Sequence, residues 1–81
     1  MTKKQIADHI IHEAAECFYT ARNSQFIDMK KTMSERIFAY AEMYFSCFAN
    51  NNPYDPTYES IFKLHKLIEG DISRMYSEIF K

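Results

Sequence analysis

The stretch NNNPYDP, residues 50–56, is the strongest interruption in this chain of 81 residues. Asparagine readily adopts the left-handed conformation that ends helices, and Pro53 cannot continue a helix because it lacks an N–H group. Asp55 is a good N-cap residue, and Pro56 is favoured at the first position of a helix. The stretch therefore predicts one helix that ends before it and another that begins at Pro56.

Outside this stretch the chain contains only one helix-breaking residue, Gly70, because both prolines lie within it. Apolar residues recur at the helical spacing of three and four in three segments. The predicted helices span residues 3–22, 24–49 and 56–80. Three such helices joined by short connections predict an all-α fold, a small three-helix antiparallel bundle that forms a single domain over residues 1–81.

The start of the second helix has two solutions in the sequence. Asn23 and Ser24 offer a break followed by a cap, whereas residues 32–35 (TMSE) fit a capping box. Apolar residues keep one helical phase from Phe26 to Phe48. This continuity favours the earlier start, at Ser24, over a start at Thr32.

The second helix carries a wide apolar surface between Ile37 and Phe48. Its apolar residues cover roughly 220° of the circumference, whereas an ordinary surface helix has a stripe a little over about 100° wide. Two neighbouring helices cover only part of this surface, so we expect the edge with Phe38 and Phe45 to need another cover. Association through the second helix is predicted, as a homodimer or with another protein. In the alternative, the first and third helices spread apart and cover the whole apolar surface of the second helix.

Tyr54 lies in the proline-flanked loop and belongs to no apolar stripe. An exposed Tyr on a rigid loop is typical of an interface anchor. The ring can equally fold over the end of the bundle with its hydroxyl in water. The predicted partner-binding residues are Phe38, Phe45 and Tyr54.

The charge balance does not favour a nucleic-acid partner. Ten basic and eleven acidic residues give a net charge of −1, whereas nucleic-acid binders usually carry a basic excess that neutralises phosphates. A local basic cluster near the start of the second helix is the exception, because anions are stabilised at helix N-termini. This cluster gives the alternative function, binding of nucleic acid or of a nucleotide phosphate. Its members are Arg22, Lys30, Lys31 and Arg36.

His and Glu residues at helical spacing in the first helix give a third hypothesis, a metal-binding bundle. The sequence has neither an HExxH motif nor the ExxH order of di-iron bundles. His9, His12, Glu13 and Glu16 fall opposite the apolar stripe, whereas metal sites in bundles use inward-facing ligands. We therefore expect a solvated face with His–Glu pairs at i,i+4, and we assign no metal ligand and no cofactor.

His65 lies inside the apolar arc of the third helix, near Tyr58 and Tyr76. We expect it at the edge of the core, hydrogen-bonded to a Tyr hydroxyl or a carbonyl. A ligand contact or a pH-sensitive switch is the alternative. Cys17 and Cys47 are too far apart in sequence for a CxxC pair or a zinc motif, so we expect free thiols in a reducing cytoplasm.

No feature of the sequence indicates catalysis. It has no Gly-rich phosphate loop, and no Ser or Cys stands beside a base and an acid at a readable spacing. The apolar window is shorter than the roughly 20 residues of a membrane span, and residues 1–14 lack the features of a secretory signal. We expect a non-enzymatic cytoplasmic protein-protein interaction module, an adaptor or inhibitor of a larger protein. Phages and mobile elements often encode proteins of this kind.

Overall fold

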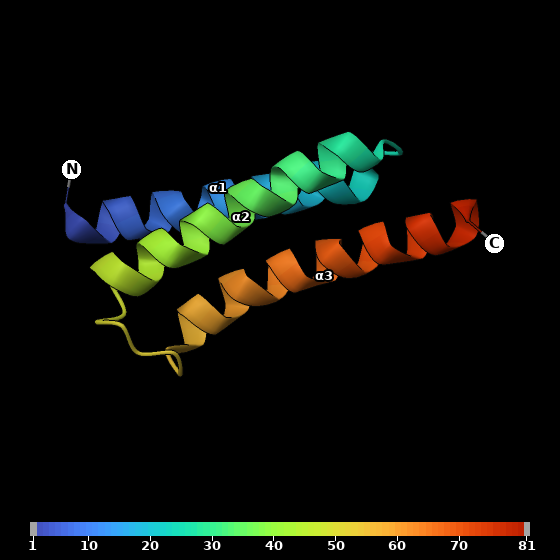
Figure 1. Cartoon of the computed structure of the whole chain (residues 1–81). Coiled ribbons are helices and arrows are strands. Elements are labelled where there is room, and N and C mark those ends of the chain that lie inside the picture. The colour runs from blue at the N-terminus through green and yellow to red at the C-terminus, as the bar shows by residue number, and fades with distance from the viewer. Residues whose placement is uncertain (1, 81) are drawn as a thin grey trace.

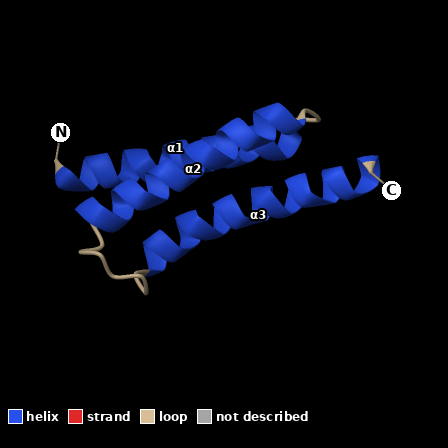
Figure 2. Cartoon of the chain, in the orientation of Figure 1, coloured by secondary structure: helices blue, strands red, loops and turns tan. Residues whose placement is uncertain are grey.

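The computed structural model describes residues 2–80, which form three α-helices. They are α1 (Lys3–Asn23), α2 (Ile27–Cys47) and α3 (Pro56–Ile79). In Figure 1 the chain runs from left to right through α1, returns through α2, and runs from left to right again through α3, so consecutive helices are antiparallel. The described residues contain no strand (Figure 2). The predicted all-α three-helix antiparallel bundle is confirmed.

Local hydrogen bonds define the ends of α1 and the start of α2. The Thr2 hydroxyl accepts from the Gln5 backbone N–H, and the Gln5 side chain accepts from the Thr2 N–H, which is a complete capping box. The Ser24 hydroxyl accepts from the N–H of Phe26 in the turn that follows α1. α2 begins at Ile27, three residues after the preferred start at Ser24. The alternative start at Thr32 is wrong, because Thr32 lies inside α2.

The loop between α2 and α3 has the conformation that its sequence predicts. Asn50 and Asn51 adopt positive φ angles of 52° and 58°, which end α2 as asparagine does at helix C-termini. The Asp55 carboxylate accepts from the N–H of Tyr58 at 2.9 Å, and Pro56 occupies the first turn of α3. This loop therefore holds the start of α3 rigidly against the end of α2.

The core is narrow and consists largely of small side chains. Ala14, Ala21 and Ala41 have no exposed surface, and Ile37 and Ile68 are the largest side chains that are fully buried. Small residues at these positions let the helices approach closely. The other buried hydrophobic residues are Ile10, Cys17, Ala49 and Ile61.

The bundle is elongated, with α2 as its central helix. α1 and α3 each pack more extensively on α2 than on each other. The Cα atoms extend over 48 × 23 × 14 Å, and their radius of gyration is 13.7 Å. A compact chain of this length would have a radius of gyration of roughly 11.7 Å. Side chains on the long faces therefore lie close to solvent.

Replacement of Gly70 by Ala should raise the free energy of unfolding by about 1 kcal/mol, because Ala is the better helix former. Gly70 is exposed within α3, and an added Cβ atom would meet nothing within 4 Å. Urea unfolding followed by circular dichroism measures the change. A lower free energy of unfolding in Gly70→Ala would contradict a continuous α3.

Candidate functional site

No aromatic side chain is fully buried, although six of them pack against the core. The chain contains seven Phe and six Tyr, all within residues 2–80, and none of these residues is buried. Buried hydrophobic positions are taken instead by Ile, Ala and Cys. An aromatic side chain can bury roughly 150–250 Å². The largely exposed rings, with 40–79 % of their surface accessible, are those of Tyr19, Phe26, Phe38, Tyr54 and Phe80.

Four rings form a continuous row along the seam between α2 and α3. This aromatic row consists of Phe38 and Phe45 on α2 with Tyr58 and Phe62 on α3. The ring centroids are 4.8 Å apart for Phe45 and Tyr58, and 5.9 Å apart for Tyr58 and Phe62. Those of Phe62 and Phe38 are 6.2 Å apart. These separations are typical of interacting aromatic pairs, so the rings hold one another in place.

α3 covers part of the edge that the sequence analysis left without a cover. Phe45 is half-buried against Tyr58, whereas Phe38 remains 40 % exposed beside Phe62 and His65. α3 reaches this edge because its own aromatic residues extend its apolar arc toward α2. The opposite edge of the wide apolar surface also reaches solvent, since Met43 is 47 % exposed.

Tyr54 projects from the loop at one end of the aromatic row. It is 79 % exposed, and its backbone N–H donates to the Asn52 side chain at 3.0 Å. The ring therefore does not fold over the end of the bundle. A groove of about 430 Å³ runs from this loop along the outer side of α3. It is lined by Pro53, Tyr58, Glu59, Phe62, Lys63 and Lys66.

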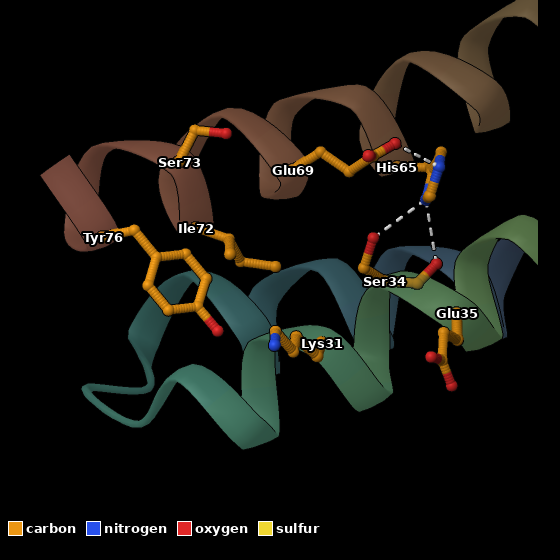
Figure 3. A pocket seen from close by; sticks show the side chains of 8 residues that line it. All are labelled: Lys31, Ser34, Glu35, His65, Glu69, Ile72, Ser73 and Tyr76. Atoms are coloured by element: carbon orange, nitrogen blue, oxygen red, sulfur yellow. Dashed lines mark hydrogen bonds and ion pairs between the residues drawn. The ribbon is translucent and has the colours of Figure 1, made fainter.

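A polar cluster continues the α2–α3 seam beyond the aromatic row (Figure 3). His65 on α3 places its Nδ1 atom 3.0 Å from the Ser34 carbonyl oxygen and 2.9 Å from the Ser34 hydroxyl. Its Nε2 atom lies 2.5 Å from a carboxylate oxygen of Glu69. The ring also contacts Phe38, with centroids 5.1 Å apart. The predicted hydrogen bond from His65 to a carbonyl is confirmed.

The geometry of this cluster suits a structural link between α2 and α3. Nδ1 of His65 lies within hydrogen-bond distance of both Ser34 oxygens, and Nε2 faces the Glu69 carboxylate. Ser34, His65 and Glu69 are the residue types of a nucleophilic triad. However, Ser34 is only 4 % exposed. The Ser34 hydroxyl is therefore covered, and the cluster fixes the rotation of α3 against α2.

The groove beside this cluster has a volume of about 490 Å³ and extends to Lys31 and Tyr76. The ammonium nitrogen of Lys31 lies 5.1 Å from the centroid of the Tyr76 ring. The Tyr76 side chain raises the pKa of Lys31, with smaller contributions from Asp28 and Glu35. Lys31 therefore keeps its positive charge at neutral pH and stays on the surface of α2.

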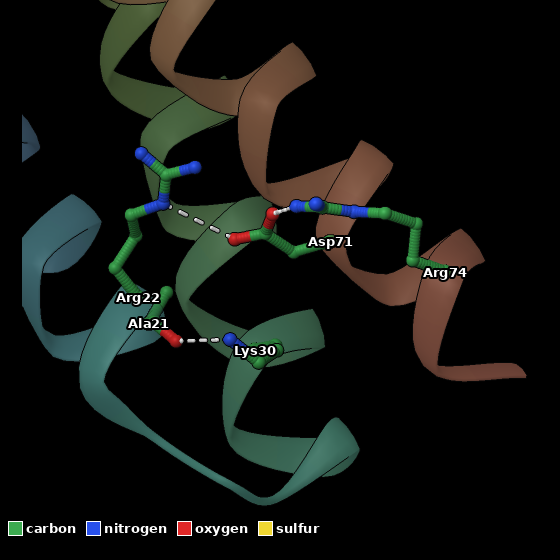
Figure 4. A network of polar contacts seen from close by, with 5 residues as sticks. All are labelled: Ala21, Arg22, Lys30, Asp71 and Arg74. Carbon is green, nitrogen blue, oxygen red and sulfur yellow. Dashed lines mark hydrogen bonds and ion pairs between the residues drawn. The ribbon is translucent and has the colours of Figure 1, made fainter. Parts of the chain in front are cut away.

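Two of the four basic residues predicted as an anion site already have partners in the structure (Figure 4). Arg22 pairs with Asp71 at 3.3 Å, and Asp71 also pairs with Arg74. The buried Lys30 donates from Nζ to the Ala21 carbonyl at 2.8 Å, which satisfies the C-terminal end of α1. Both positive charges are therefore already paired with groups of the bundle.

The other two basic residues lie elsewhere on α2. Lys31 lines the groove beside His65, whereas Arg36 lies near Cys17 on the side of α1. Arg22 and Lys30 line a third groove, of about 310 Å³. The structure therefore divides the predicted anion cluster among separate surfaces.

The polar face of α1 is solvated. His12 and Glu16 are exposed and form the predicted i,i+4 pair, with 3.4 Å between Nε2 and Oε1. His9 is exposed and Glu13 is half-exposed. Within residues 2–80, no group of three or more His, Cys, Asp or Glu side chains converges as metal ligands would.

The two cysteines are free thiols, with Cys17 buried and Cys47 exposed. Burial raises the pKa of the Cys17 thiol, and Glu13 and Glu16 raise it further against the opposing effect of Arg36. Cys17 is therefore protonated at neutral pH and a poor nucleophile.

Sequence analysis missed two residues of this site, Phe62 and Ser34. Phe62 was recoverable, because Tyr58, Phe62 and His65 recur at i, i+4 and i+7 and so share one edge of α3. Ser34 gave no local signal. Its partner His65 lies 31 residues further along the chain, and only the packing of α3 on α2 brings them together.

No protein-family model, no curated protein and no solved structure matches this chain. None of the helices within residues 2–80 has the length and apolar character needed to cross a membrane. The site therefore has to be interpreted from its own geometry.

Asp71→Asn should lower the free energy of unfolding by about 1 kcal/mol at pH 7. Burial raises the pKa of Asp71, but hydrogen bonds from Arg22 and Arg74 outweigh it and hold this pKa below its ordinary value. The stabilisation is therefore complete above about pH 4 and is lost as pH falls through the folded-state pKa. Urea unfolding of wild type and Asp71→Asn at pH 7 and pH 3 measures this contribution to the free energy of unfolding.

The difference between wild type and Asp71→Asn should thus shrink at pH 3. The exposed Asp8 provides the matched control, and Asp8→Asn should leave the neutral-pH stability within about 0.5 kcal/mol of wild type. Equal stability of Asp71→Asn and wild type at pH 7 would contradict the role of this ion-pair network.

Proposed function

We propose that this chain is a small non-enzymatic protein-interaction module that binds its partner through the aromatic row and Tyr54. The observation that carries the proposal is that no aromatic ring is fully buried, while Phe38 and Tyr54 are 40 % and 79 % exposed. Small soluble domains rarely keep large connected apolar surfaces unless a partner covers them.

The α2–α3 face has the composition of an interface. Aromatic residues are enriched at the centres of protein interfaces, where they supply much of the binding energy, and charged residues surround them. Here Phe38 and Phe62 lie at the centre, and Glu59, Lys63 and Lys66 lie at the rim. The Lys66 ammonium is 5.3 Å from the Phe62 ring centroid, so a rim charge already contacts the row.

Packing and local hydrogen bonds hold the backbone of this site before a partner binds. The aromatic row is carried by two helices that His65 links, and Tyr54 follows a proline in a hydrogen-bonded loop. Pre-ordered side chains lose little entropy when they bind, which favours affinity. Both thiols are unpaired, which suits a protein of the reducing cytoplasm.

Affinity capture with Phe38→Ser and Tyr54→Ala tests this function. Tagged chain is incubated with lysate of its source cells, and retained proteins, untagged copies of the chain included, are quantified by mass spectrometry. Each substitution should reduce partner recovery by about tenfold, as expected for an aromatic anchor.

Ile11→Ser is the matched control, because Ile11 is 39 % exposed but lies on α1, outside the aromatic row. Its recovery of partner should equal that of wild type, and circular dichroism should give the same helix content for all variants. Equal recovery by Phe38→Ser, Tyr54→Ala and wild type would contradict the proposal.

A further inference from the structure

We draw no further inference here: the strongest candidate, the aromatic row on the seam between α2 and α3, is a partly exposed apolar face, and nothing in the structure shows what covers it.

Discussion

The close approach of the helices through alanine is the constraint on which the rest of the structure depends. Ala14, Ala21 and Ala41 are completely buried where the helices meet, and the largest fully buried side chains are those of Ile37 and Ile68. The aromatic rings lie around this core, where each remains partly or largely exposed.

Polar contacts link each pair of helices. Lys30 of α2 holds the last turn of α1, His65 of α3 holds Ser34 of α2, and Arg22 of α1 holds Asp71 of α3. A narrow apolar core is non-directional and would let the helices rotate about their axes. Directional contacts such as these select one rotation, and with it the register in which the aromatic row is assembled.

The local features could be read from the sequence, and the features that depend on pairing between helices could not. The Asp55 cap, Pro56 and the positive φ angles of Asn50 arise from residues adjacent in the chain, so the helix ends fell within a few positions of prediction. Arg22 seemed available for an anion because its partner Asp71 is 49 residues away. For the same reason, the sequence could not decide whether α3 covers Phe45.

The central claim is that Phe38 and Tyr54 lie on the surface that binds a partner. Photo-crosslinking tests it most directly, because a photoreactive phenylalanine analogue at one position reacts only with a protein in contact with that position. With the analogue in place of Phe38 or Tyr54, irradiation in a lysate of the source cells should give a crosslinked product heavier than the 9.7 kDa chain, whereas the analogue in place of the exposed Ile11 on α1 should give none. Equal crosslinking at all three positions, or none at Phe38 and Tyr54, would contradict it.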